Sequence, residues 1–190
     1  IMGKERKNKV GSFFESYAES FDSIYGHREK RSFLGRITDR LFRKAMYSRF
    51  EKTLNNIKKD DINSVLDVGC GSGRYCIEYL KLGKSVFGID LADEMIKIAN
   101  DVCKNEIPNG DIELVQGDYF DHELNKKYDA SVLMGLFDYI SNPKDLLEKL
   151  KKDTNKIILG SFPKLWNIWT LQRMVRYKIR RCPLFFYTKN

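Results

Sequence analysis

One stretch decides the fold of this chain, Val65-Leu66-Asp67-Val68-Gly69-Cys70-Gly71-Ser72-Gly73-Arg74-Tyr75. It opens with an apolar segment over residues 64–68, broken only by Asp67, which is typical of a strand covered on both faces. Three glycines follow at alternate positions, and each lacks the Cβ that would hinder a sharp turn or the close approach of a ligand. We expect Ser72 to cap a helix through Leu82, whose first free N–H groups point at whatever lies above the turn.

This strand, turn and helix resemble the Gly-x-Gly-x-Gly loop of class I S-adenosylmethionine (SAM) methyltransferases. A dinucleotide-binding turn and a plain tight turn are the alternatives. The dinucleotide pattern requires its third glycine where Arg74 stands. Asp67, which we expect to face the ligand, suits the cationic methionyl part of SAM and would repel a pyrophosphate. The resemblance implies SAM as cofactor, S-adenosylhomocysteine (SAH) as product, and a cofactor site that includes Asp67, Gly69, Cys70, Gly71 and Gly73.

Four further apolar segments predict strands at residues 85–90, 112–119, 128–135 and 156–162. Segments with helical patterns lie between them, including one that begins at Asn142-Pro143 with asparagine as cap and proline in the first turn. Strands and helices that alternate from about residue 61 to residue 162 indicate an α/β fold. We expect a doubly wound, mostly parallel Rossmann-like sheet with helices on both faces and an N-terminal helical cap.

Asp90 ends the second predicted strand, where open α/β sheets place the acid that binds ribose hydroxyls. It could instead only cap the helix predicted from Ala92 to Lys104, and the two roles are compatible. The resemblance implies that Leu91 lies against the adenine. It also implies an adenine contact at the end of the third strand, which reads Gly117-Asp118-Tyr119.

The exit of the fourth strand is where the family builds the methyl-transfer side of its pocket, which here implicates Met134 and Gly135. The candidate acid–base groups are Tyr139, Asp138 and His27, with His122 a weaker candidate because it lies beside the adenine end. No motif compels any of these assignments. The Asn/Asp-Pro-Pro-Tyr motif that the family uses for exocyclic amines of nucleobases does not follow the fourth strand.

Residues 1–60 read as a helical lid or cap on a core of residues 61–190. Aromatic residues recur at spacings of three and four in a first helix, which indicates core packing or a pocket wall. Related enzymes use such a helix as a lid with a tyrosine near the methyl donor, which makes Tyr17 and Tyr25 candidates. A second helix, over about residues 35–58, is expected to turn Met46, Phe50 and Leu54 inward and to carry Arg49 among its surrounding charges.

The charge divides unevenly along the chain. Residues 1–60 hold 15 Lys and Arg against 8 Asp and Glu, residues 61–160 hold 12 against 18, and residues 161–190 hold 7 against none. A basic, aromatic helix is predicted at 163–181, with Trp166, Trp169, Arg173 and Arg176 as candidate substrate contacts. Such a helix suits a cover over a substrate pocket, an anionic ligand, or peripheral contact with a membrane.

The chain also resembles, more loosely, the magnesium-protoporphyrin O-methyltransferases. The likeness lies in the helix entry Phe21-Asp22-Ser23-Ile24-Tyr25-Gly26 and in the turn Ser161-Phe162-Pro163. Our main hypothesis is a SAM-dependent methyltransferase that acts on a small or medium anionic substrate, at oxygen. A nucleic-acid partner, with RNA as the methyl acceptor, and a non-catalytic SAM-fold binding module are the alternatives.

Other features bound the class of protein. The four cysteines show no Cys-x-x-Cys pair, and the two histidines are scattered, so we expect reduced thiols and no metal site. No apolar run reaches the length of about 18 residues that a membrane span needs, so we expect a cytoplasmic protein. A fifth strand without a neighbour would leave an open hydrophobic sheet edge. We therefore expect either a fragment or a chain that pairs with another molecule there, and its oligomeric state stays open.

Overall fold

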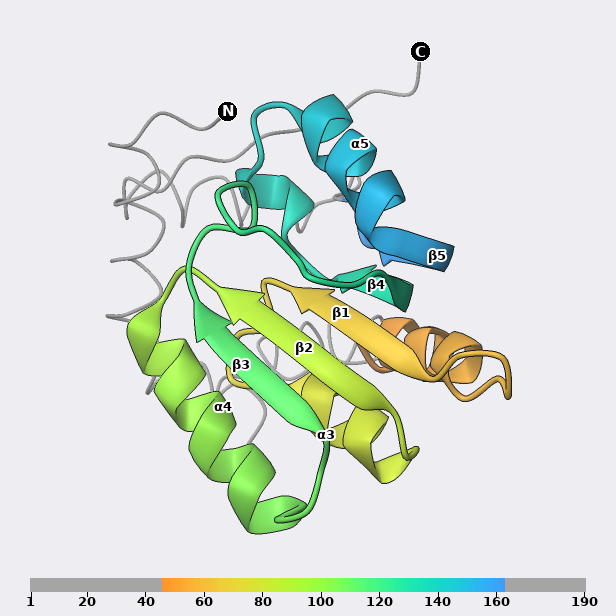
Figure 1. Cartoon of the computed structure of the whole chain (residues 1–190), viewed down its shortest axis with the longest axis vertical. Coiled ribbons are helices and arrows are strands. Elements are labelled where there is room, and N and C mark those ends of the chain that lie inside the picture. Colours follow the sequence, from red (N-terminus) through yellow and green to blue (C-terminus); the bar gives the residue numbers. More distant parts are fainter. Residues whose placement is uncertain (1–45, 163–190) are drawn as a thin grey trace, which may run out of the picture.

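The structure is a computed structural model that describes residues 46–162 (Figure 1). A helix over residues 46–57 comes first. The elements that follow are β1 (Ser64–Val68), α3 (Arg74–Lys81), β2 (Ser85–Asp90), α4 (Asp93–Glu106), β3 (Ile112–Gln116), β4 (Tyr128–Leu133), the 3₁₀ helix η1 (Phe137–Tyr139), α5 (Pro143–Asp153) and β5 (Thr154–Gly160). Strands and helices thus alternate as the sequence predicts, except between β3 and β4, which a connection without a helix joins.

The five strands form one parallel sheet in the order β3-β2-β1-β4-β5. Val65 of β1 is aligned with Val86 of β2 on one side and with Ala130 of β4 on the other. The chain winds outward from β1 to β3 and then crosses back to β4. The order therefore reverses between β1 and β4, which is the point where open α/β sheets bind their ligands, at the carboxyl ends of the strands.

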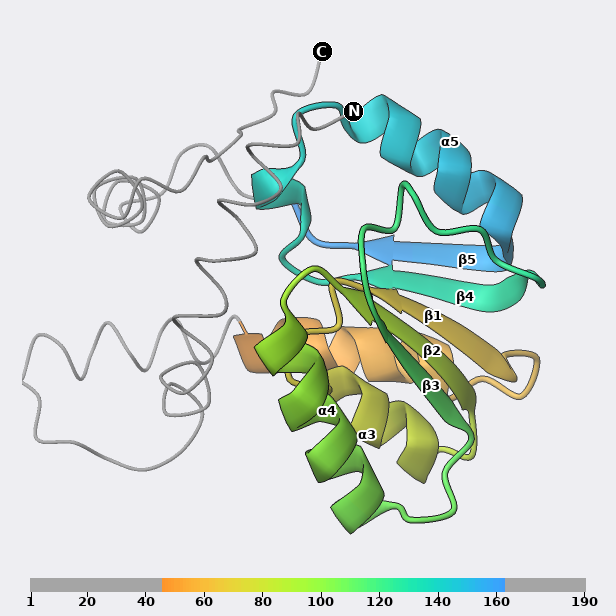
Figure 2. The ribbon, with the colours of Figure 1, turned by 60° about the vertical axis from the view of Figure 1, so that its left-hand side comes forward.

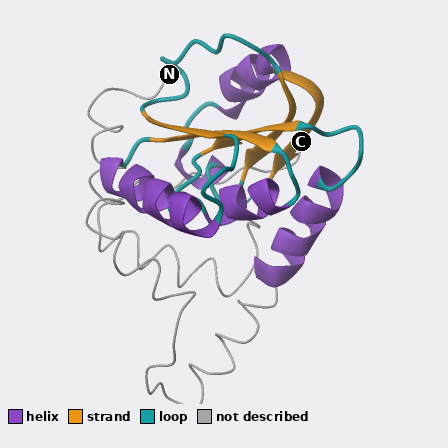
Figure 3. Cartoon of the chain, turned by 60° about the horizontal axis from the view of Figure 1, so that its bottom comes forward, coloured by secondary structure: helices purple, strands orange, loops and turns teal. Residues whose placement is uncertain are grey.

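Helices cover both faces of the sheet (Figures 2 and 3). The helix over 46–57, α3 and α4 lie on one face, and α5 lies on the other. Because successive strand residues point to opposite faces, Val65 packs in the core on the α3 side while Leu66 and Val68 pack in the core on the α5 side. A central strand buried on both faces explains why residues 64–68 are almost wholly apolar.

Two local predictions need correction. Ser72 does not cap the first helix, since the N-cap is Gly73 in a left-handed conformation with φ of 76° and no side chain caps it. The third strand also ends at Gln116, the fourth ends at Leu133, and the fifth begins at Thr154 and ends at Gly160. The Gly117 N–H still donates to the Asp90 carbonyl of β2, and the chain leaves the ladder after this bond.

Asn142 caps α5 as expected, since its side chain accepts from the Lys144 N–H and Pro143 occupies the first turn. The predicted lid and basic helix fall mostly on residues 1–45 and 163–190, which lie outside the described residues. Within the described part, the helices contain no stretch long and apolar enough to cross a membrane.

Candidate cofactor and active site

The loop after β1 is held in place by backbone hydrogen bonds to the end of β2. The N–H groups of Gly69 and Cys70 donate to the Ile89 carbonyl at 2.8 and 3.2 Å. Gly69, Gly71 and Gly73 have φ values of 76°, 55° and 76°, a left-handed conformation that side chains disfavour. The alternation of glycines therefore follows from three positive φ angles in five residues.

The three glycines differ in what a side chain would meet. A Cβ on Gly73 would lie 2.9 Å from the Ala99 Cβ in α4, so this glycine permits close packing of the loop on that helix. A Cβ on Gly69 would lie 3.2 Å from the Leu136 Cδ1. A Cβ on Gly71 would meet nothing within 4 Å. Gly71 thus borders open space beside the loop, as a residue that a ligand approaches closely should.

Asp90 joins this loop to the start of α4. One carboxylate oxygen accepts from the Gly71 N–H at 2.9 Å, and the other accepts from the Ala92 N–H at 3.0 Å. Burial raises the pKa of Asp90, and these backbone donors oppose the rise. The Leu91 N–H is a third backbone donor to this carboxylate. Because a carboxylate offers about four lone-pair positions, acceptor capacity still remains for a ligand hydroxyl. The expected ribose contact stays a prediction, whereas the expected helix cap is wrong, because the N-cap of α4 is Ala92 and no side chain caps it.

Asp67 lies behind the loop, with 2% of its surface exposed. Its Oδ2 atom accepts from the Cys76 thiol of α3 at 3.6 Å. Burial raises the pKa of Asp67 to about 7, and the charge of Asp90 adds to the rise. Asp67 therefore faces α3, whereas the sequence led us to expect a carboxylate that faces the ligand, and a direct cofactor contact stays a prediction.

The residues predicted on the adenine side separate into two groups. Leu91 is half-buried, and its carbonyl accepts from the Gln116 side chain at 3.0 Å. The Asp118 carboxylate accepts from the Phe120 N–H at 2.8 Å and shapes the turn after Gly117. Tyr119, by contrast, is packed in the core on the α5 side.

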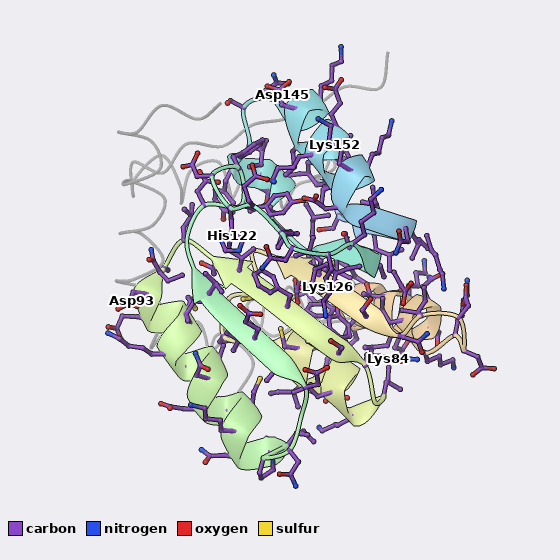
Figure 4. All side chains as sticks on the ribbon, in the orientation of Figure 1. Lys84, Asp93, His122, Lys126, Asp145 and Lys152 are labelled. Carbon is purple, nitrogen blue, oxygen red and sulfur yellow. The ribbon has the colours of Figure 1, made fainter. Side chains whose placement is uncertain are left out.

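The Tyr119 side chain is 4% exposed. Its hydroxyl donates to the Asp153 carboxylate at 2.5 Å, and Lys149 Nζ lies over its ring. These contacts give the Tyr119 side chain a packing role on the α5 face. His122 lies in the same connection between β3 and β4. Figure 4 shows it toward the end of the sheet where α4 begins at Asp93, away from the end that carries Lys84.

The exits of β4 and β5 meet on the other half of the carboxyl edge. The Gly135 N–H donates to Ser161 Oγ at 2.8 Å, and the Ser161 N–H donates to the Leu133 carbonyl at 3.2 Å. Gly135 has a φ of 83°, and a Cβ there would meet nothing within 4 Å. Open space therefore borders Gly135 as it borders Gly71. Leu136, which follows β4, lies against Gly69, which follows β1, so the exits of β1 and β4 are side by side.

Two catalytic candidates follow this exit in η1. Asp138 is 6% exposed and Tyr139 is 7% exposed. The other candidates named from the sequence lie outside the described residues. These are His27, Tyr17, Tyr25, Trp166, Trp169, Arg173 and Arg176. Residues 46–162 hold no group of three His, Cys, Asp or Glu side chains that could bind a metal ion.

Arg49 belongs to this region although its sequence pattern placed it only among the charges around its helix. Arg49 is half-buried, and its Nη1 atom lies 3.4 Å from Ser161 Oγ. Thr53 and Ile57, spaced four and eight residues later, are 3% and 0% exposed. The spacing of four is the signal that could have placed Arg49 on the packed face of the helix.

Residues 65–154 match the family model described as a methyltransferase domain. The order of the parallel strands agrees with this match, since it gives the chain the Rossmann-like fold of class I SAM-dependent methyltransferases. The resemblance to class I SAM-dependent methyltransferases that the glycine loop indicated is confirmed.

Two curated relatives illustrate the likeness in sequence. A protein described as an uncharacterized methyltransferase from Anoxybacillus flavithermus is 25% identical over 131 residues, which are 68% of this chain and 53% of that protein. The mitochondrial ubiquinone biosynthesis O-methyltransferase of Schizosaccharomyces pombe is 26% identical over 99 residues, 50% of this chain and 36% of that protein. The chain thus spans about half, or less, of the length of the curated relatives that it matches.

A solved structure extends the likeness over nearly the whole chain. Magnesium protoporphyrin IX methyltransferase from Synechocystis, with bound SAH, matches with a TM-score of 0.71 and 18% identity, over 97% of this chain and 84% of that one. At this identity the match concerns the fold. It agrees with the looser resemblance that the sequence indicated.

Proposed function

We propose that this protein is a SAM-dependent methyltransferase that acts at oxygen on a small or medium anionic acceptor. One observation carries the cofactor assignment. Gly71 borders open space at the switch point of the sheet, and its N–H is fixed by Asp90, whose carboxylate keeps acceptor capacity for hydroxyl donors. The magnesium protoporphyrin IX methyltransferase with bound SAH, which shares this fold, supports the assignment.

The cofactor would supply a methyl group that its sulfonium already makes electrophilic. The residues of this chain then have two tasks, which are to orient the reactants and to exclude water. Gly71 admits the cofactor to the backbone of the loop that Gly69 and Gly73 shape, and Asp90 orients its ribose. Where the acceptor must lose a proton, Tyr139 and Asp138 are the acid–base candidates within the described residues.

Two considerations support an anionic oxygen acceptor. The named relatives include a ubiquinone biosynthesis O-methyltransferase and a magnesium protoporphyrin IX methyltransferase. Residues 161–190 carry 7 Lys and Arg and no acid. We propose that Arg173 and Arg176, with Trp166 and Trp169, face this acceptor, with contact to RNA or to an anionic membrane surface as the competing partners.

Calorimetry with SAH and with NAD tests the cofactor. SAH should bind and raise the unfolding temperature, because a ligand that binds only the native state stabilises it. Binding of NAD without binding of SAH would overturn the assignment.

Transfer of labelled methyl from SAM then tests the acceptor class. The acceptors to compare are protoporphyrin IX, 4-hydroxybenzoate and an RNA transcript. Labelling of a small carboxylate or phenol supports the proposal, and labelling of RNA alone refutes it. A partner that is RNA would also show a steep fall of affinity with salt.

A further inference from the structure

The turn that follows β3 is fastened to α5 by Lys149. The turn runs from Asp118 to Asp121, whose N–H donates to the Asp118 carbonyl at 3.0 Å. Lys149 Nζ donates to the His122 carbonyl, just after the turn, at 2.9 Å, and lies 4.9 Å from the centre of the Tyr119 ring within it. One lysine side chain of α5 therefore contacts this segment at two points.

Asp153, one helical turn after Lys149, completes the arrangement. Its Oδ2 atom accepts from the Tyr119 hydroxyl at 2.5 Å and lies 3.5 Å from Lys149 Nζ. The Lys149 and Asp153 side chains are only 19% and 18% exposed. Removal of one partner from a largely dehydrated ion pair leaves the other charge uncompensated, which is costly. We call Tyr119, Lys149 and Asp153 the clasp, since together they tie the turn to the helix.

The Asp118 carboxylate is the group whose position depends on the clasp. Asp118 directly precedes Tyr119, so the clasp acts on it through a single peptide bond. Its Oδ1 atom accepts from the Phe120 N–H at 2.8 Å, which ties the side chain to the backbone of the turn as aspartate commonly does. The carboxylate therefore moves with the turn, and α5 fixes the turn.

The turn lies where the base of a bound nucleoside would be. Asp90, the predicted ribose contact, is aligned with Gln116 of β3, and its carbonyl accepts from the Gly117 N–H at 2.8 Å. The glycine loop follows β1, and β1 and β3 flank β2 on opposite sides. A ribose at Asp90 whose methionyl chain runs toward Gly71 therefore directs its base toward the end of β3, where Asp118 stands.

An ionised carboxylate accepts hydrogen bonds and cannot donate them. It favours a base with an amino group and disfavours one with a carbonyl oxygen at the same position, which is the difference between adenine and hypoxanthine at position 6. We propose that Lys149 is a positioning residue for this choice, because it holds the turn so that Asp118 meets the 6-amino group. The proposal rests on the proposed function, which supplies SAM as the nucleoside, and on the predicted contact of Asp118 with adenine.

The decisive variant is Lys149→Met, which removes the ammonium and keeps a long side chain. Lys152→Met, at an exposed position of the same helix, is the matched control for the lost charge. Asp118→Asn keeps an oxygen for the Phe120 N–H and adds an amide that can donate to a carbonyl. The probes are SAH and S-inosylhomocysteine, which carry a 6-amino and a 6-oxo group. Calorimetry measures the ratio of their dissociation constants.

This ratio should respond to the clasp and to Asp118 alone. Wild type and Lys152→Met should both prefer SAH by about tenfold or more. Lys149→Met should reduce the preference by about fivefold or more, because the loosened turn no longer holds the carboxylate at the amino group. Asp118→Asn should lose the preference. Adding Lys149→Met to Asp118→Asn should cause no further loss, since the lysine acts through the aspartate.

A merely structural clasp would give a different result. Lys149→Met would then weaken both ligands by the same factor and keep the wild-type ratio, which overturns the proposal. Equal affinity of wild type for the two probes also overturns it, because Asp118 would then not distinguish the 6-position.

Urea unfolding shows whether Lys149→Met folds. If it does not, Tyr119→Phe takes its place, since this variant removes only the bond to Asp153. A reduced preference for SAH in Tyr119→Phe then supports the proposal, and an unchanged preference overturns it. Failure of wild type to bind either probe would instead refute the proposed function, so the two failures are distinguishable.

Discussion

Gly71→Ala separates the binding role of the glycine loop from its role in folding. The substitution adds a single methyl group at a position where φ is 55° and where a Cβ meets no protein atom within 4 Å. The folded protein therefore has room for the methyl group, and only the backbone strain at this residue lowers its stability. A ligand that lies against this part of the loop, in contrast, must give way to it.

The size of both effects follows from this geometry. A left-handed conformation costs a residue with a Cβ roughly 1–2 kcal/mol. Alanine recovers roughly 0.4–1 kcal/mol because it restricts the unfolded chain, so the free energy of unfolding should fall by about 1 kcal/mol. Overpacking against a fitted partner costs typically 1–3 kcal/mol. Since each 1.4 kcal/mol is about tenfold in affinity, SAH should bind roughly 10- to 100-fold more weakly.

Gly83→Ala is the matched control. Gly83 also has a positive φ, of 71°, and a Cβ there also meets nothing within 4 Å. It lies in the turn between α3 and β2, at the end of the sheet opposite the glycine loop. It should lose the same stability as Gly71→Ala and bind SAH like wild type. Urea unfolding measures the first quantity, and calorimetry with SAH measures the second.

Equal SAH affinity for wild type and Gly71→Ala would refute the placement of the cofactor on this loop. A fall of several kcal/mol in the stability of Gly71→Ala, with little change for Gly83→Ala, would refute the argument that the space beside Gly71 is open.

Three further predictions concern single side chains. Asp90→Ala should lower the free energy of unfolding by about 1–3 kcal/mol, because the Gly71 and Ala92 N–H groups lose a charged acceptor. The substitution should also weaken the binding of 5′-methylthioadenosine and of SAH by the same factor. Unchanged affinity for both ligands would show that Asp90 has a structural role and no role in binding. Burial raises the pKa of Asp67 from 3.8 to about 7, so the native state holds a proton that the unfolded chain has released between these values. Stability should therefore fall with rising pH, by about 4 kcal/mol across that window. The free energy of unfolding of Asp67→Asn, measured with urea from pH 4 to pH 8, should not show this fall. A fall equal to that of wild type would contradict its assignment to Asp67. Tyr139→Phe should lower kcat by about 10²- to 10⁴-fold and leave SAH affinity intact if its hydroxyl serves proton transfer, and an unchanged kcat removes it from the chemistry.

Local pattern was enough to predict most of the fold. Strands β1 and β2 lie at the residues that their apolar runs indicated, because a parallel strand buried on both faces must be apolar throughout. Asn142-Pro143 likewise begins α5, since the capping bond involves only neighbours in the chain. The Ser72 cap failed for a local reason as well. The left-handed Gly73 takes the N-cap position, one residue after the predicted cap.

The site divides in the same way. The order of glycines and the position of Asp90 are properties of the sequence alone, because positive φ angles select glycine and the end of a strand lies at the ligand edge. Only the tertiary structure could show that Asp67 turns toward Cys76, or that Tyr119 reaches Asp153, 34 residues away. Arg49 and Ser161 are 112 residues apart and meet because a helix before β1 packs beside the exits of β4 and β5. Such contacts depend on how packed elements fill space, which no periodicity within a single segment records.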